Sequence, residues 1–483
     1  MGKIHQLHTA ISCSFASVLT GLLYVWPSYT LGLYTASDTS LLTSPMTDVE
    51  SSLLGSLPSL GAMLGSVIVG GVISHLGRQK GGMVLVLPFV ISWLIIDFTS
   101  STTMILIARF IGGIGCGSVL VFAPIYISEV AEESIRGSLA SVPVASYCIG
   151  VQLSYIVGWF LSYRYVLWVN LASSILGVAL MMTVTESPIF LLRQNREEDA
   201  KLAIAHYRGE SPSSKIVLEE ISRLKQLIMP AVELAAINVV AEDTVKAEES
   251  EKEKLNGQSA EPEMTSKISS FKMLYLSPSS RRGFMVVGLS LSLQVMMGMV
   301  PVQVYAKQIF SQSAPTLSSH LCSVMFATVI LVGSLISLVV ADKFGRKMLL
   351  IISSVSVALC LVSMGLLLQT GIGPPWITAV LILVYCFFFM FGAGSIPYVL
   401  MSECFLPEVQ SLASTLLMEW VWLLNFFIIG VFPFMIKYLG IHGSFYAFAC
   451  FAVTDVCVAL FLVPETKGLT NDQIQEALMR RRK

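Results

Sequence analysis

Twelve long apolar runs restrict what this chain can fold into more than any other feature of its sequence. Each is close to the length of about 20 residues that a helix needs to cross a bilayer. In the first part of the chain they predict spanning helices near 9–33, 51–74, 82–101, 104–127, 138–163 and 165–184. In the second part they predict helices near 283–308, 319–341, 348–369, 375–401, 412–437 and 441–463. We therefore expect an all-α membrane protein with twelve transmembrane helices.

The composition supports this expectation. Of the 483 residues, 54% are hydrophobic and 13% are charged, whereas about a quarter of a typical soluble domain is charged. The net charge of −1 excludes a broadly basic nucleic-acid-binding protein. The first apolar run lacks the small-residue cleavage site of a secretory signal peptide, so we expect it to remain as a span.

The nine cysteines and six histidines give no sign of a cofactor. The cysteines are scattered in or beside the apolar runs without a C-x-x-C pair, which is typical of buried packing residues. The histidines lack metal-ligand spacing, and no nucleophile stands at a useful spacing from a base. We expect no metal, no cofactor and no enzyme activity.

A long polar segment separates the two sets of spans. It is amphipathic over 197–207 and 216–227, and it is acidic and free of aromatic residues over 241–263. The acidic tract is typical of a disordered linker, and a partner-binding tail is the alternative interpretation. The predicted parts are an N-terminal six-helix bundle (1–185), a cytoplasmic linker with short helices (186–282), a C-terminal six-helix bundle (283–463) and a cytoplasmic tail (464–483).

Basic residues indicate the orientation of the chain. In the short loops they gather on the side that carries the N-terminus, at Lys3, Arg78, Arg136, Arg346 and Lys347 among others. Because cytoplasmic loops carry an excess of Lys and Arg, we expect both termini to be cytoplasmic.

One polar hairpin occurs twice. Residues 342–347 (Asp-Lys-Phe-Gly-Arg-Lys) lie between two apolar runs, and 74–80 (Ser-His-Leu-Gly-Arg-Gln-Lys) lie between two others. A charge at bilayer depth costs about 2.5 to 3.5 kcal/mol, so both segments should form tight loops at a membrane face. The copy at 74–80 retains Gly-Arg without the acid, and two copies of one hairpin suggest internal duplication.

Further pairs of motifs repeat in the same order in the two halves. Residues 124–129 end in Glu129 and are followed by Arg136, while 397–403 end in Glu403. Glu186-Ser187-Pro188 ends the first set of spans, as 464–468 (Pro-Glu-Thr-Lys-Gly) ends the second. A single such motif is more simply interpreted as a charged loop end near lipid headgroups. Several in matching order favour a functional repeat.

Together these motifs resemble the sugar-porter branch of the major facilitator superfamily. Its hairpin pattern G-x-x-x-D-[RK]-x-G-R-[RK] fits 342–347, although Leu338 replaces the leading glycine, and its P-E-T-K-G motif is matched at 464–468. The stretch 403–413 is most similar to insect facilitated trehalose transporters. The resemblance implies two six-helix bundles around a central cavity.

The resemblance also implies a cytoplasmic network of charges that locks the inner ends of the helices together. Its members in this chain are Arg78, Glu129, Arg136, Glu186, Asp342, Arg346, Glu403 and Glu465. Ion pairs at a partly desolvated interface can favour one state of a rocking bundle and break in the other. Ser74 stands where the family has an aspartate.

For the substrate, the resemblance implies contacts by polar and aromatic residues of the spans. These are Gln152, Gln294, Trp422, Asn425 and Tyr398, the last replacing a tryptophan. An amide side chain suits sugar hydroxyls because it offers donors and an acceptor without a net charge. Val295, Val300 and Met390 replace polar residues of the family, so the pocket offers fewer polar contacts than is usual.

Arg109, Glu419 and Asp455 are ionisable residues inside predicted spans, where such residues are usually functional. Arg109 matches the span-four arginine of the family, and snorkelling toward the membrane surface is the alternative interpretation. Glu419 has no counterpart in the family pattern. Asp455 is expected to face a neighbouring helix.

The expected function is facilitated, uncoupled transport of a sugar such as trehalose or a hexose, by alternating access, by a monomer in the plasma membrane. The resemblance implies that proton-driven relatives pair the span-four arginine with an aspartate in span one. Pro27 falls at that position, and no Asp or Glu occurs between Met1 and Ser37. A non-transporting sugar sensor and a facilitator for a less polar small solute are the alternatives.

Overall fold

All regular secondary structure in the described part of the chain is helical, which confirms the predicted all-α class. The structure is a computed structural model that describes residues 2–226, 270–469 and 471–479. At 270, 338–343, 407–408 and 471–472 it describes the backbone alone. The acidic tract predicted at 241–263 lies outside the described residues.

The first half of the chain contributes seven helices to the membrane bundle. They are α1 (Gly2–Val25), α2 (Pro27–Thr35), α3 (Asp48–Phe98), α4 (Thr102–Val130), α5 (Glu133–Ala140), α6 (Val142–Phe160) and α7 (Tyr163–Met182). The helices α1 and α2 form one span that is interrupted at Trp26, directly before Pro27.

The second half repeats this arrangement. Its elements are α11 (Ser270–Leu276), α12 (Pro278–Met296), α13 (Met299–Val304), α14 (Ala306–Ser313), α15 (Ser319–Phe344), α16 (Arg346–Thr370), α17 (Pro375–Phe388), the π-helix η1 (Phe389–Ala393), α18 (Ile396–Glu403), α19 (Pro407–Phe461) and α20 (Asn471–Met479). The span formed by α12 and α13 is interrupted at Gly298, whose φ is 83°.

Ten stretches of the described helices are long and apolar enough to cross a membrane. Two of them, α3 with 51 residues and α19 with 55, are too long for a single crossing, which takes about 20 residues. Each contains one residue with non-helical backbone angles, Gly77 in α3 and Gly440 in α19, where the chain folds back. Counting these two helices twice gives the twelve spans that the sequence predicts.

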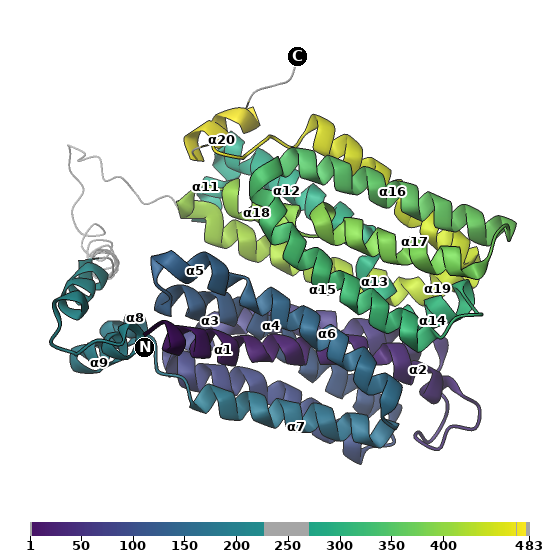
Figure 1. Cartoon of the computed structure of the whole chain (residues 1–483), viewed down its shortest axis with the longest axis horizontal. Coiled ribbons are helices and arrows are strands. Elements are labelled where there is room, and N and C mark those ends of the chain that lie inside the picture. The colour runs from purple at the N-terminus through teal and green to yellow at the C-terminus, as the bar shows by residue number, and fades with distance from the viewer. Residues whose placement is uncertain (1, 227–269, 470, 480–483) are drawn as a thin grey trace, which may run out of the picture.

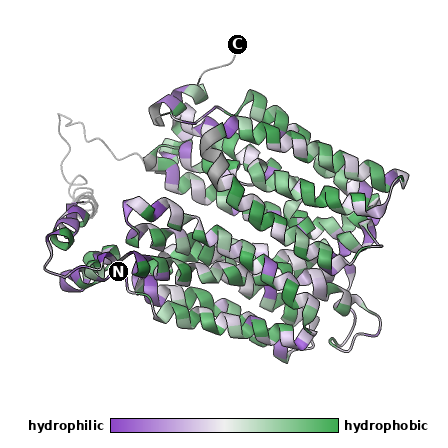
Figure 2. Ribbon diagram, viewed as in Figure 1, coloured by the Kyte–Doolittle hydropathy of each residue, from purple (hydrophilic) through white to green (hydrophobic). Residues whose placement is uncertain are grey.

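The spans form two groups that lie side by side (Figure 1). Helices of the first half, purple to blue, pack together, and helices of the second half, green to yellow, pack beside them. The N-terminus, α8 (Pro188–Arg193), α9 (Glu197–Arg208) and α20 lie at the same end, which we name the terminal face; the other end is the opposite face. Apolar residues cover the helices between these faces (Figure 2).

Glycines bring the second and fourth spans into close contact. The two spans carry one G-x-x-x-G pair each, Gly61 with Gly65 and Gly113 with Gly117. A Cβ atom at any of the four would lie between 1.9 and 2.3 Å from a backbone oxygen of the facing helix. Small residues at this spacing allow helix backbones to approach closely in membranes. This contact sets the distance between α3 and the side chains of α4.

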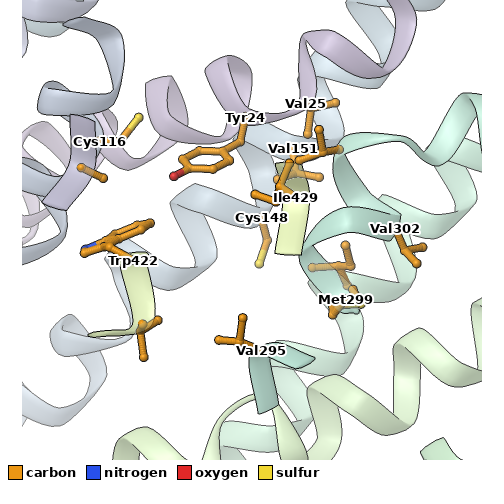
Figure 3. Packing of buried hydrophobic residues seen from close by; sticks show 14 of the residues in the cluster. Tyr24, Val25, Cys116, Cys148, Val151, Val295, Met299, Val302, Trp422 and Ile429 are labelled. Carbon is orange, nitrogen blue, oxygen red and sulfur yellow. The ribbon is translucent and has the colours of Figure 1, made fainter. Parts of the chain in front are cut away.

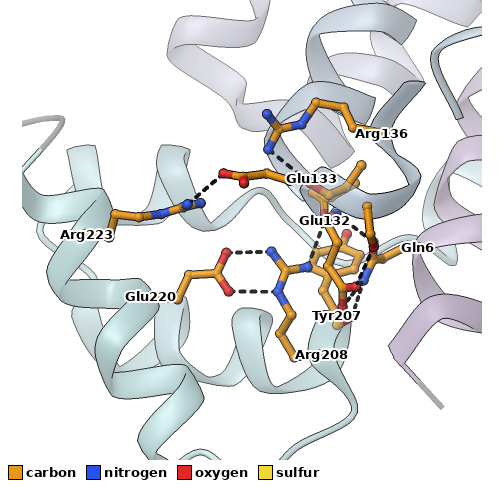
Figure 4. A network of polar contacts seen from close by, with 11 residues as sticks. Gln6, Glu132, Glu133, Arg136, Tyr207, Arg208, Glu220 and Arg223 are labelled. Atoms are coloured by element: carbon orange, nitrogen blue, oxygen red, sulfur yellow. Dashed lines mark hydrogen bonds and ion pairs between the residues drawn. The ribbon is translucent and has the colours of Figure 1, made fainter. Parts of the chain in front are cut away.

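A small helical unit lies against the terminal face of the first half. Its apolar core contains Leu191, Ala200, Ile204 and Val217, contributed by α8, α9 and a helix over 215–226. Polar contacts fix it to the bundle (Figure 4). They include the bonds from Gln6 Nε2 to the carbonyl of Tyr207, from Arg208 to the carbonyl of Val130, and from Arg223 to Glu133. Inside the unit, Arg208 also pairs with Glu220.

Candidate functional site

The first copy of the repeated hairpin turns at Gly77. Its φ of 83° and ψ of −175° lie in a region of backbone space that is open essentially to glycine alone. The carboxylate of Glu186 lies against this turn and accepts hydrogen bonds from the backbone N–H groups of Arg78 (2.6 Å) and Gln79 (3.1 Å). These N–H groups begin a helical segment and have no helical partner, so Glu186 caps that segment.

The second copy has the same geometry. Gly345 has φ of 87° and ψ of 150°, and the carboxylate of Glu465 accepts hydrogen bonds from the N–H groups of Arg346 (2.9 Å) and Lys347 (3.2 Å). Because the same glycine, arginine and capping acid recur, the repeated sequence corresponds to a repeated structure.

Each hairpin arginine also pairs with an acid at the end of another helix. Arg78 donates to both carboxylate oxygens of Glu129, at 2.8 and 2.5 Å, and is 5% exposed. Arg346 donates through two nitrogens to Oε1 of Glu403, at 3.2 and 2.9 Å. The remaining oxygen of Glu403 accepts from the hydroxyl of Thr466 (2.5 Å). An arginine with several such bonds holds a carboxylate in one orientation.

The predicted gating residues therefore divide into two clusters, one in each half. Arg78, Glu129 and Glu186 lie together in the first, and Arg346, Glu403 and Glu465 in the second, and all the contacts described above stay within one half. Arg136 lies apart from both: it donates to the carbonyl of Ala131 (3.3 Å) and has no ion pair among the described side chains. The side chain of Asp342 lies outside the described residues.

Two pairs of helices join the halves. One pair is α3 and α19, which run antiparallel: Asp48 forms an ion pair with Lys437, the Ser52 hydroxyl donates to the carbonyl of Gly430, and the Ser66 hydroxyl donates to Glu419 (2.5 Å). The other pair is α6 and α15. There Thr328 donates to Oε1 of Gln152 (3.2 Å), and Cys148 contacts Ser334 (3.6 Å).

Near the opposite face the interrupted spans also meet. The hydroxyl of Ser28 in α2 accepts from the backbone N–H of Lys307 in α14 (3.0 Å). The hydroxyl of Tyr155 donates to the carbonyl of Gln303 (2.6 Å), whose side chain donates to the hydroxyl of Tyr147 (2.8 Å). The described polar contacts between the halves thus extend from the opposite face toward the middle of the bundle.

Of the predicted substrate residues, Trp422, Gln294 and Asn425 are buried, whereas Gln152 lies between α6 and α15, where it bonds Thr328. Trp422 of α19 stacks on Tyr24 of α1, with 6.4 Å between the ring centres, and Figure 3 shows the two side chains pointing toward one another. Gln294 and Asn425 are 8% and 7% exposed, and one amide oxygen of each has no hydrogen-bond partner in the described structure. Gln294 lies beside Tyr398.

The sequence interpretation missed Tyr24, Tyr147 and Gln303, which meet at the same junction. Gln303 could have been found, because it is a polar residue close to Pro301 within an apolar run. The two tyrosines could not, because aromatic residues are common throughout the spans.

The three intramembrane charges have different surroundings. Arg109 is fully buried, which excludes snorkelling, and donates to the carbonyls of Leu23 (2.6 Å) and Leu54 (3.1 Å). Glu419 accepts from Ser66 through one oxygen, and its other oxygen is buried without a partner. Asp455 accepts from Ser354 of the neighbouring α16 (2.6 Å), as expected for a residue that faces another helix.

Two bundles of six spans, joined by buried polar and aromatic residues and carrying a repeated charged hairpin, define a membrane transporter of the major facilitator class. The sequence matches the family described as "Sugar (and other) transporter" over residues 13–233 and 227–478. The chain therefore belongs to that family, which is one of transporters and not of enzymes, and the expected family is confirmed.

Several relatives share this family. The chain is 25% identical to a protein named facilitated trehalose transporter Tret1-2 homolog of Drosophila simulans, over 99% of this chain and 91% of that protein. It is also 25% identical to the facilitated trehalose transporter Tret1 of Aedes aegypti, over 99% of this chain and 55% of that protein. The chain thus spans about half the length of several relatives that it matches.

A solved structure has the same fold. The inward open conformation of the xylose transporter XylE from E. coli superposes with a TM-score of 0.75, at 21% identity, over 98% of this chain and 99% of that one. The structure bound to 6-bromo-6-deoxy-D-glucose superposes with a TM-score of 0.71. At this identity the likeness concerns the fold alone.

Proposed function

We propose that this protein carries a neutral sugar, such as trehalose or a hexose, across the plasma membrane by facilitated, uncoupled transport. In this proposal it acts as a monomer, its terminal face is cytoplasmic, and the polar segment 186–282 is a cytoplasmic linker between bundles at 1–185 and 283–463. The trehalose relatives and the basic loops support the substrate class and the orientation.

The observation that carries the proposal is the pair of buried amide oxygens on Gln294 and Asn425. A buried polar atom without a partner is uncommon in a folded protein and calls for an explanation. Asn425 lies on the same helix as Trp422, which stacks on Tyr24 of the first half, and Gln294 lies beside Tyr398. Sugar hydroxyls would donate to these oxygens, and the aromatic rings would cover the apolar face of a sugar.

The contacts between the halves support alternating access. They run from the opposite face to the middle, whereas the charged clusters at the terminal face each stay within one half. We infer from this distribution of contacts that the structure is an inward-facing state. Transport then requires the contacts at the opposite face to separate as the terminal ends approach.

Uptake of labelled sugars into vesicles that contain the purified protein tests the proposal. We expect Gln294→Leu to reduce uptake strongly while the amount of protein at the cell surface is unchanged. Gln369→Leu is a matched control, because Gln369 bonds Tyr446 in the outer part of the second half. Normal uptake in Gln294→Leu, or an equal loss in the control, would contradict the assigned pocket.

One observation favours a second candidate, a facilitator for a less polar small solute. Val295, Met299, Val302 and Ile429 are buried around the same junction (Figure 3). A panel that includes polyols of decreasing hydroxyl content distinguishes the two, because a sugar carrier should lose transport rate as hydroxyls are removed. If none of these compounds is transported in a saturable manner, the sugar-sensor alternative is favoured.

A further inference from the structure

Prolines interrupt several of the membrane-spanning helices, and each interruption leaves a carbonyl oxygen without its usual donor. Proline has no backbone N–H, so the carbonyl four residues before it loses its helical hydrogen bond. Inside a bilayer no bulk water replaces that bond, and groups from neighbouring helices satisfy the freed carbonyl instead. In this protein, side chains of other spans bond several of these carbonyls.

Arg109 serves two freed carbonyls at once. Its Nη1 donates to the carbonyl of Leu23, four residues before Pro27, and its Nε donates to the carbonyl of Leu54, four residues before Pro58. The fourth span lies close enough for this because glycines join it to α3. Two acceptors in fixed positions require two donors in fixed geometry, which a guanidinium supplies and an ammonium does not.

The second half contains a matching arrangement without a charge. The hydroxyl of Tyr385 donates to the carbonyl of Met297 (2.9 Å), four residues before Pro301. Pro301 follows Pro27 by 274 residues, which is also the separation of the two acids that pair with the hairpin arginines. In each half, therefore, a side chain of the fourth span bonds the carbonyl that a proline frees in the first span. Because a neutral hydroxyl donates this hydrogen bond in the second half, the arrangement requires a hydrogen-bond donor and does not require a positive charge.

The segments that follow these prolines form contacts between the halves near the opposite face. Ser28, next to Pro27, accepts from the N–H of Lys307, and Gln303, two residues after Pro301, accepts from Tyr155. The direction in which each segment leaves its interruption decides whether these contacts form. The hydrogen bond to the carbonyl that the proline frees therefore controls the contacts between the halves near the opposite face.

We propose that Arg109 and Tyr385 are positioning residues, which tie the proline interruptions of the first and seventh spans to the fourth and tenth. Each of these hydrogen bonds makes the segment that follows the proline, which contacts the other half, move with its own half when the halves rock. Arg109 is thus a fixed structural donor in this protein and takes no part in a proton switch. The effect of the ties on uptake rests on the proposed transport function, whereas their effect on stability does not.

A rescue experiment tests the proposal on Arg109 with a variant that keeps a basic residue. Arg109→Lys loses the fixed second donor position, so one freed carbonyl remains unsatisfied. We expect the maximal rate of uptake to fall by about tenfold with little change in KM, since an unsatisfied buried carbonyl destabilises the helix that carries it. Adding Pro58→Ala supplies an N–H to the carbonyl of Leu54 and should restore the rate to within about twofold.

Pro88→Ala is the matched control, because Pro88 also lies inside α3 but the carbonyl it frees, at Val84, is not bonded by Arg109. It should not rescue Arg109→Lys. Failure of Pro58→Ala to rescue, or equal rescue by Pro88→Ala, would overturn the proposal.

Thermal unfolding of the same purified variants separates this proposal from the transport function. The same order is expected, with Arg109→Lys less stable than the parent and restored by Pro58→Ala but not by Pro88→Ala. This order in a protein that moves no sugar would contradict the transport function alone. If Arg109→Lys does not fold, Tyr385→Phe provides the test, since it removes only a hydroxyl; a rate no lower than that of the control Tyr126→Phe would refute the tie in the second half.

Discussion

Replacing Gly77 with alanine should damage the first hairpin, because two separate features of the structure exclude a side chain there. The backbone angles, φ of 83° and ψ of −175°, suit only glycine. A Cβ atom would also lie 2.4 Å from an oxygen of Glu186 and 2.8 Å from the ring of Phe190. The carboxylate of Glu186 would have to leave the turn that it caps.

The magnitude follows from these two features. Holding a residue other than glycine in this backbone region costs about 1 to 3 kcal/mol. Moving Glu186 weakens its charge-assisted bonds to the N–H groups of Arg78 and Gln79, and each such bond contributes about 1.5 to 3 kcal/mol. Loss of one bond together with the backbone strain gives about 2.5 to 6 kcal/mol. A destabilisation of this size exceeds that of most single substitutions.

Denaturant or thermal unfolding of the purified protein in detergent, together with the amount at the cell surface, measures this effect. Gly70→Ala is the control, since a Cβ atom at Gly70 meets nothing within 4 Å, and alanine is favoured over glycine in a helix by about 0.5 to 1 kcal/mol. Gly345→Ala should resemble Gly77→Ala, because its Cβ would lie 2.8 Å from Glu465. Equal stabilities of Gly77→Ala and Gly70→Ala would refute the reasoning.

Three further predictions concern the conformational state of the protein, its coupling to protons and the effect of pH on α9. Asp342→Asn should shift the balance of states more than Ser74→Ala, because only the second hairpin retains its acid; labelling of cysteines placed at the opposite face measures this, and equal, negligible effects would contradict it. Sugar should equilibrate without accumulation in vesicles given an inward proton gradient; uphill uptake would refute this. Burial and the nearby His5 and His8 lower the pKa of His206 below its ordinary value of 6.5, so the docked α9 prefers the neutral ring. Docking should weaken as the pH falls through about 6.5, seen as faster hydrogen exchange in α9, and unchanged exchange would contradict it.

The positions of the spans could be predicted because hydrophobicity alone decides which segments enter a bilayer. The interruptions inside the spans could not be predicted from the same signal. Trp26 and Gly298 lie in strongly apolar runs, and the π-helix at Phe389–Ala393 has no distinctive composition. Prolines mark some of these places, but a proline does not show whether a helix bends, stops or continues.

Most members of the hairpin clusters were predictable, although Arg136 lies apart from them, and their arrangement was not predictable. Repeated motifs identified Arg78, Glu129 and Glu186 as related, and the structure places them in contact. The motifs could not show that these contacts stay within one half in this state, because a sequence does not specify which of two conformations is described. Arg109 shows the same limit, since its partners are backbone carbonyls, which any residue type can provide.

The two halves share the residues that hold each half together, and they differ in the residues that join one half to the other. Gly345 follows Gly77 by 268 residues, and Ser334 follows Ser66 by the same number. The hairpins and their arginines are alike because both halves must be rigid. Where the halves meet, along the helix pairs α3–α19 and α6–α15, the matching serines have different partners. Ser66 donates to the carboxylate of Glu419, whereas Ser334 contacts the thiol of Cys148. A carboxylate binds a hydroxyl more strongly than a thiol does, so the interface between α3 and α19 resists separation more than the interface between α6 and α15. The halves should therefore part first at α6 and α15, where Gln152 lies.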